Sequence, residues 1–196
     1  MKKIIALSIV LLLTACGGYD DIDAMREAKM GSDTPITSPS KPDKPNNPNS
    51  NWQYSSVADG DRVFALSATN YSVNTYQRPD YPNLQGKPWV TIERTQTRDG
   101  AITNTIVIFA DSNTSCSPSC DVRMTFDGQT AIYRMRNNID GVLRPIDDRT
   151  GNTLFKKFTT TNLAVTELPI IGLSEPFAAR FNLSGYEIKR MKFTSE

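Results

Sequence analysis

The chain of 196 residues contains no histidine. This absence excludes the Ser-His-Asp and Cys-His nucleophile arrangements, the zincin motif and the usual histidine pH switch. A basic block is also missing, because 22 Lys and Arg residues balance 21 Asp and Glu residues and give a net charge of +1. Such a chain has no electrostatic footprint for nucleic acid. We therefore expect a protein that is not an enzyme, that holds no metal or cofactor and that has no nucleic-acid partner.

Long hydrophobic runs are scarce as well. The longest, from Ile4 to Leu13, covers about ten residues, half of the roughly 20 that a helix needs to cross a bilayer. Lys2 and Lys3 precede it and two small residues follow it, which is the order of a secretory signal peptide. The pattern predicts that residues 1–15 are a cleaved signal peptide rather than a permanent membrane anchor.

Cysteine occurs three times, and the first occurrence stands at the predicted cleavage site. Leu13-Thr14-Ala15-Cys16 resembles the lipobox of bacterial lipoproteins. The resemblance implies that the sulfur of Cys16 carries a diacylglyceryl group and that acyl chains anchor the protein to a lipid bilayer. Gly17 and Gly18 follow without an aspartate, which by analogy with enteric lipoproteins favours the outer membrane, with the domain facing the periplasm or the cell surface. The alternative is a soluble periplasmic protein with a chance cysteine.

Cys116 and Cys120 form an even pair in a compartment that we expect to be oxidising. A Cys-x-x-x-Cys loop can be a redox pair or half of a metal site. A redox pair, however, is normally Cys-x-x-Cys in a thioredoxin-like pattern, and zinc takes four ligands. We favour a structural disulfide that holds the loop before the strand that begins at Cys120.

Residues 16–51 are predicted to be a lipidated N-terminus and a disordered tether. From Gly31 to Asn51 the chain is rich in Pro, Ser, Asn and Lys and has no hydrophobic periodicity. At roughly 3 Å per residue when extended, this segment would hold a domain about 60 Å from a membrane.

Residues 52–196 alternate between apolar and polar side chains and predict one β-rich domain. The strongest local signal is Arg98-Asp99-Gly100 between two strand-like runs, which predicts a hairpin. We predict loops at 71–87 and 138–151, a short helix capped by Asn152 or Thr153 that runs through Thr160, and a last segment that closes the sheet or forms a helix. The predicted strands are 52–57, 62–70, 88–96, 102–110, 120–127, 130–136, 163–169 and 176–185. The predicted fold is mainly β, an antiparallel β-sandwich or partly open barrel with one or two short helices.

The predicted loop after residue 70 is rich in aromatic residues. Tyr71, Tyr76, Tyr81 and Trp89 are candidate binding residues, because rigid amphipathic rings cover area with little loss of entropy. The alternative is a loop that packs onto its own domain.

Carboxylates offer two further candidates. Asp140, Asp147 and Asp148 are clustered as calcium ligands often are, but their spacing does not fit an EF-hand and two arginines lie among them, so a solvated loop is favoured. Three other carboxylates are candidates for paired acids in glycoside hydrolysis, although no spacing selects a pair. They are Glu93, Asp127 and Glu167.

An ordered series of elements spans roughly 80 residues of the C-terminal part. The series is Ile106 to Phe109, Val122 to Gly128, Phe155 to Phe158, Leu163 to Val165 and Phe181 to Gly185. In this order the chain resembles TagO- or VasI-like accessory proteins of type VI secretion and related periplasmic domains. It differs from them in having no cysteine in the strand at Ile106 or near the C-terminus. The resemblance implies a β-rich envelope domain.

These observations favour a non-enzymatic outer-membrane lipoprotein that binds an envelope protein partner or serves a surface or secretion assembly. The alternative is a lipid-anchored inhibitor, immunity or exclusion protein that acts against a toxin, hydrolase, phage or plasmid through the tyrosine-rich loop. A small cell-wall hydrolase is the third hypothesis.

Overall fold

A computed structural model gives the structure of the chain and describes residues 50–139 and 141–193. The predicted signal peptide, Cys16 and nearly all of the predicted tether lie outside the described residues. The elements, in chain order, are β1 (Trp52–Asp59), β2 (Arg62–Tyr71), β3 (Tyr76–Gln77), β4 (Gln85–Gly86), β5 (Trp89–Gln96), β6 (Ile102–Phe109), β7 (Ser119–Phe126), β8 (Gln129–Ile139), β9 (Val142–Pro145), α1 (Asp148–Thr160), β10 (Leu163–Leu168), β11 (Phe177–Asn182) and the 3₁₀ helix η1 (Ile188–Met191).

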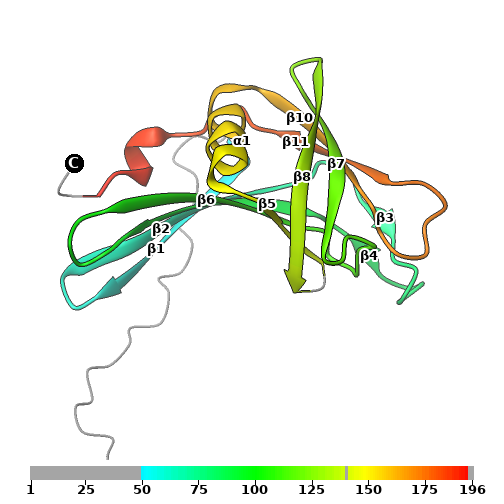
Figure 1. Cartoon of the computed structure of the whole chain (residues 1–196), viewed down its shortest axis with the longest axis horizontal. Helices are drawn as coiled ribbons and strands as arrows, with labels where there is room; N and C mark the ends of the chain where they lie inside the picture. The colour runs from blue at the N-terminus through cyan, green and yellow to red at the C-terminus, as the bar shows by residue number, and fades with distance from the viewer. Residues whose placement is uncertain (1–49, 140, 194–196) are drawn as a thin grey trace, which may run out of the picture. The chain divides into compact units, whose positions relative to one another are not determined.

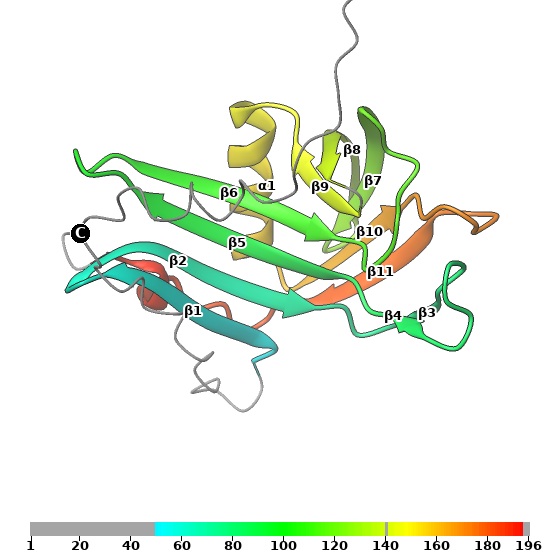
Figure 2. The ribbon, with the colours of Figure 1, turned by 90° about the horizontal axis from the view of Figure 1, so that it is seen from below.

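Nine strands form one antiparallel sheet in the order β1-β2-β5-β6-β9-β8-β7-β10-β11, and β3 and β4 form a separate small hairpin. Figure 2 shows β1, β2, β5 and β6 side by side. The predicted fold class is confirmed, because the described part of the chain is mainly β, antiparallel and contains one α-helix. The sheet is not closed into a barrel.

The two predicted hairpins form where glycine permits a positive φ angle. Between β5 and β6, the turn has Gly100 at φ +90°, and Thr97 N donates to Ala101 O at 2.9 Å. Between β7 and β8, Asp127 and Gly128 both have positive φ angles, 44° and 85°. Two such residues in succession match the right-handed twist of the strands that they join.

The sheet curls around a single core. Val122, Met124 and Phe126 on β7 alternate into it as predicted, and buried residues from both halves of the sheet belong to the same cluster. The two ends of the sheet approach each other, because Val73 N, just after β2, donates to Arg180 O on β11 at 2.7 Å. This contact covers part of the outer edge of β11.

Helix α1 lies over β6 and buries Leu154 and Phe158 (Figure 1). Its predicted start at Asn152 or Thr153 is wrong. The cap is Asp147, whose carboxylate accepts a hydrogen bond from Thr150 N at 2.7 Å. The helix therefore begins within the predicted loop at 138–151, and Gly151 lies buried beside Pro145 in its first turn.

Both predicted loops contain short strands. The predicted loop at 138–151 contains β9 and the first turn of α1, and the loop at 71–87 contains β3 and β4. These strands have two to four residues, too few to show a period of two in sequence.

The segment after β11 packs against β1. The indole nitrogen of Trp52 donates to Leu183 O at 2.9 Å, and Tyr54 Oη accepts from Glu187 N at 2.6 Å. Tyr186 completes this aromatic contact, with its ring centroid 5.2 Å from that of Trp52. Of the two alternatives for the last segment, the structure therefore shows the helical one, as the short helix η1.

Candidate functional site

The predicted binding loop divides into buried and exposed residues. Tyr76 is only 6% exposed, its hydroxyl donates to Ala110 O at 2.8 Å, and its ring lies 4.9 Å from that of Phe177. Burial raises the pKa of Tyr76 to about 12. Tyr76 is therefore a core residue that attaches the β3–β4 hairpin to the domain, whereas Tyr71 and Tyr81 are exposed.

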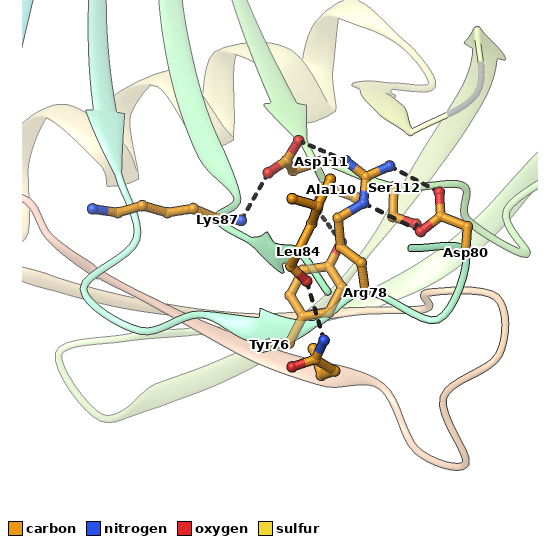
Figure 3. Close-up of polar contacts among 9 residues, drawn as sticks. Tyr76, Arg78, Asp80, Leu84, Lys87, Ala110, Asp111 and Ser112 are labelled. Atoms are coloured by element: carbon orange, nitrogen blue, oxygen red, sulfur yellow. Dashed lines mark hydrogen bonds and ion pairs between the residues drawn. The ribbon is translucent and has the colours of Figure 1, made fainter. Parts of the chain in front are cut away.

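A polar network holds the same hairpin against the chain that follows β6 (Figure 3). Arg78 forms two hydrogen bonds to the carboxylate of Asp80, at 3.2 and 2.8 Å, and lies 3.6 Å from Asp111. Ser112 donates to Asp80 at 3.2 Å, and the backbone N of Lys87 donates to Asp111 at 2.8 Å. The hydrogen bonds from Arg78 hold the pKa of Asp80 below its usual value. The network fixes the hairpin by contacts at both of its ends.

Four side chains form a row across one end of the sheet. Tyr71 on β2 lies opposite Trp89 on β5, Trp89 lies opposite Phe109 on β6, and Phe109 lies opposite Val142 on β9. The rings of Trp89 and Phe109 are stacked with centroids 4.6 Å apart, and the Tyr71 centroid lies 6.0 Å from Trp89. We call these four residues the aromatic ladder.

The aromatic ladder lies on the outer face of the sheet, because the residues next to it, Val90 and Ile108, point into the core. Tyr71 is 38% exposed, and Trp89 and Phe109 are partly exposed. The ladder thus presents apolar surface that the described part of the domain leaves partly uncovered.

Depressions lie on both sides of the aromatic ladder. One, of about 200 Å³, is lined by Trp89, Phe109 and Val142 together with polar groups that include Arg78 and Asp111. The other, of about 480 Å³, is lined by Tyr71 and by residues at the start of β1 and after β2.

Two cations lie over exposed tyrosine rings, one of which belongs to the aromatic ladder. Lys87 Nζ lies 5.9 Å from the ring centroid of Tyr71, and the guanidinium of Arg78 lies 5.0 Å from that of Tyr81. The charge of Arg78 is balanced by Asp80 and Asp111, so Lys87 is the cation that adds positive charge to the aromatic surface.

Sequence reasoning found Tyr71 and Trp89 but missed Phe109 and Val142. The signal for Phe109 was present in the predicted hairpin, since pairing outward from the turn at Gly100 places Phe109 opposite Trp89. Val142 had no such signal, because β9 was not predicted.

Cys116 and Cys120 are joined by a disulfide, with Cα atoms 4.9 Å apart. The bond lies directly before and at the start of β7, where the favoured hypothesis places it. Cys116 is completely buried, and Asn137 N on β8 donates to Pro118 O within the loop at 3.0 Å. The loop is thus held by a covalent bond and by the neighbouring strand.

The candidate acids have separate partners. Glu93 lies 3.9 Å from Arg144, and Glu167 lies 3.5 Å from Arg123. The carboxylate of Asp127 accepts hydrogen bonds from two backbone N–H groups at the start of β10. Each of the three acids is therefore held by a different part of the domain.

For the predicted calcium alternative, Asp140 lies outside the described residues, and Asp147 caps α1. In residues 50–139 and 141–193, no group of three or more acidic or cysteine side chains is placed to hold a metal ion. The same ranges contain no helix with the length and apolar character to span a membrane.

Comparison of the chain with protein-family models, with curated proteins and with solved structures finds no match. A functional proposal for this chain therefore rests on its residues and their geometry.

Proposed function

We propose that this chain is an outer-membrane lipoprotein, anchored through acylated Cys16, that acts as a non-enzymatic binding component of an envelope or secretion assembly. The observation that carries the binding proposal is the aromatic ladder, in which Tyr71, Trp89 and Phe109 present partly exposed rings on one face. The resemblance of Leu13 to Cys16 to a lipobox supports the anchor.

The ladder has the properties of a contact surface for a protein. Aromatic residues are enriched at the centres of interfaces, because they bury large areas and lose few rotamers on binding. Here the rings project from paired strands, so their positions are set before a partner arrives. Lys87 adds positive charge at the border of the surface, where charge affects partner choice and association rate.

A pair of variants on one strand tests the surface. Tyr71 and Phe64 both lie on β2 and are 38% and 37% exposed, but only Tyr71 belongs to the aromatic ladder. A photoreactive residue at Val73, which is 60% exposed, would report contacts in intact cells. We expect Tyr71→Ser to abolish the cross-linked adducts and Phe64→Ser to leave them unchanged. Equal adducts in both variants would contradict the proposal.

The anchor has a separate test that does not depend on the partner. In cells labelled with radioactive palmitate, the chain should carry label and sediment with the outer membrane. Cys16→Ser should carry no label and should appear in the soluble periplasmic fraction or as an uncleaved precursor. A mature Cys16→Ser protein that still fractionates with the membrane would show that the lipid attachment is wrong.

A further inference from the structure

Strand β6 is an interior strand with one half-open edge. It pairs with β5 along its whole length, from Ile102 to Phe109, but with β9 only at Ile108 and Phe109. Figure 2 shows β9 beside the C-terminal half of β6 alone. Within the described ranges, no strand pairs with this edge of β6 between Ile102 and Val107.

Pro145 explains why β9 pairs with only the last part of β6. Continuing the register of β6 and β9 by two residues would place Pro145 opposite Ile106. Proline has no backbone N–H and cannot donate to a ladder. β9 ends at Pro145, and Ile146 N instead donates to Arg134 O on β8 at 3.2 Å. The chain therefore stays with β8, leaves β6 and enters α1.

In an antiparallel pair of strands, the backbone N–H and C=O groups of successive residues point alternately toward the partner strand and away from it. This alternation identifies the backbone groups of β6 that face the opening. Thr97 N bonds to Ala101 O across the β5–β6 turn, and Ala110 N bonds to Gly141 O on the β9 side. By this alternation the backbone groups of Ile102, Asn104 and Ile106 point away from β5. Ile106 is completely buried, so the opening closes there, whereas the other two are half-buried.

The open edge of β6 lines one side of a groove. A groove of about 490 Å³ is lined by residues 102–106 on one side and by β8, β9 and the first turn of α1 on the other. The side chain of Asn104 accepts a hydrogen bond from Arg94 Nε at 2.9 Å, and Arg94 is buried. This contact adds a side-chain link between the open edge and β5, with which β6 pairs along its whole length.

Charges of opposite sign line the two faces of the groove. Arg136 and Arg144 lie opposite each other on β8 and β9, on the outer face, because their neighbours Met135 and Leu143 point into the core. Asp147 and Asp148 lie at the start of α1, which covers the inner face.

Two of these four charged side chains have partners within the domain. Arg144 has one distant partner, Glu93 at 3.9 Å, and the carboxylate of Asp147 accepts the capping hydrogen bond of α1. Arg136 and Asp148 form no ion pair with any described residue.

We propose that the β6 edge from Ile102 to Thr105 binds an extended segment of a partner protein as an added β-strand. In that strand, acidic side chains face Arg136 and Arg144, and the alternate position that faces Asp148 is basic. Addition of a strand satisfies open backbone donors and acceptors, and alternate side chains supply specificity. The site is separate from the aromatic ladder, which crosses β6 at its other end.

A defined peptide tests this proposal on the full chain in detergent. The probe is acetyl-Thr-Val-Glu-Lys-Glu-Val-Thr-amide, and the readout is amide hydrogen exchange at Ile102 and Asn104. We expect both amides to exchange fast in the free chain and at least tenfold more slowly with saturating peptide. The peptide N-methylated at lysine and both valines should not protect them, because it lacks the donors. A peptide with Glu and Lys exchanged should bind about tenfold more weakly.

Variants of the chain separate a strand-addition site from general charge attraction. Arg136→Glu should weaken binding of the probe about tenfold, whereas Arg123→Glu, the same charge change on β7, should not. Ile102→Pro removes one donor at the first residue of β6, where proline is tolerated, and should weaken binding roughly fivefold.

Three results would overturn the proposal. The first is exchange at Ile102 and Asn104 that saturating peptide does not change. The second is slow exchange at both amides in the free monomeric chain, which would mean that the chain already covers its own edge. The third is slow exchange together with a dimer in sedimentation, which would mean that a second copy occupies the groove.

Discussion

Tyr76 and Gly86 form a pair whose energetic coupling can be predicted from one distance. An added Cβ at Gly86 would lie 2.3 Å from Cζ of the Tyr76 ring, far inside van der Waals contact. The ring is buried and its hydroxyl bonds to Ala110 O, so it has little freedom to move. Gly86→Ala should therefore destabilise the domain by about 1–3 kcal/mol, the usual cost of overpacking.

The size of the coupling follows from the double variant. Tyr76→Ala alone should cost about 3–5 kcal/mol, as for other buried aromatic residues. Once the ring is gone, the alanine at position 86 meets no clash. The double variant should therefore be about as stable as Tyr76→Ala, and the coupling should equal the whole cost of Gly86→Ala. Urea unfolding, followed by circular dichroism and by the fluorescence of Trp52 and Trp89, measures each free energy.

The reasoning would be refuted if the double variant lost as much unfolding free energy as the two single variants together, within about 0.5 kcal/mol. A conservative control is Tyr76→Phe, which keeps the ring and should cost only about 1 kcal/mol for the lost hydrogen bond. The same variant isolates a pH effect. Because burial raises the pKa of Tyr76 to about 12, the fold favours the neutral phenol. The stabilisation from the neutral Tyr76 hydroxyl is complete below pH 10 and is lost as the pH rises from 10 to about 12. The free energy of unfolding of Tyr76→Phe should therefore fall less across that range than that of the parent chain.

Three further predictions concern single local contacts. The hydrogen bond from Thr150 N lowers the pKa of Asp147, so the cap stabilises α1 fully above the ordinary carboxyl pKa and this contribution is lost as the pH falls through the lowered pKa; Asp147→Ala should lower the thermal midpoint at pH 7, and its difference from the parent chain should shrink as the pH falls through the acid range. Reduction of the bond between Cys116 and Cys120 should cost about 2 kcal/mol in urea unfolding, since the closed loop is short; no change under reducing conditions would argue against a structural role. Asp127→Gly should cost about 1 kcal/mol, because glycine keeps the positive φ angle but the carboxylate acceptor is lost, and an unchanged unfolding midpoint would contradict this.

Much of the sheet could be predicted because its signals are local. Asp99-Gly100 marks a turn whatever the rest of the chain does, and the alternation of Val122, Met124 and Phe126 assigns one face of β7 without knowledge of its neighbours. The start of α1 was not predicted in this way. In sequence Asp147 resembles one acid of a polar loop, and its hydrogen bond from Thr150 N identifies it as the cap of the helix.

The candidate site was predictable to a smaller extent, because binding surfaces depend on which strands become neighbours. Tyr71, Tyr76 and Tyr81 are equivalent in sequence as rings in one loop. Burial separates Tyr76 from the other two, since Ala110, more than 30 residues away in the chain, supplies its acceptor. Phe109 joins the surface only through its place opposite Trp89.

The sequence by itself determined the features that depend on neighbouring residues: the mainly β class, the hairpin turns at glycine, the inward face of β7 and the pairing of Cys116 with Cys120 across three residues. Tertiary structure alone decided which aromatic rings reach the surface and where β6 keeps an open edge. Both depend on the register of strands that are distant in the chain, and register is set when the core is packed. A local pattern does not contain that information, because a single proline such as Pro145 opens a sheet only when another strand lies beside it.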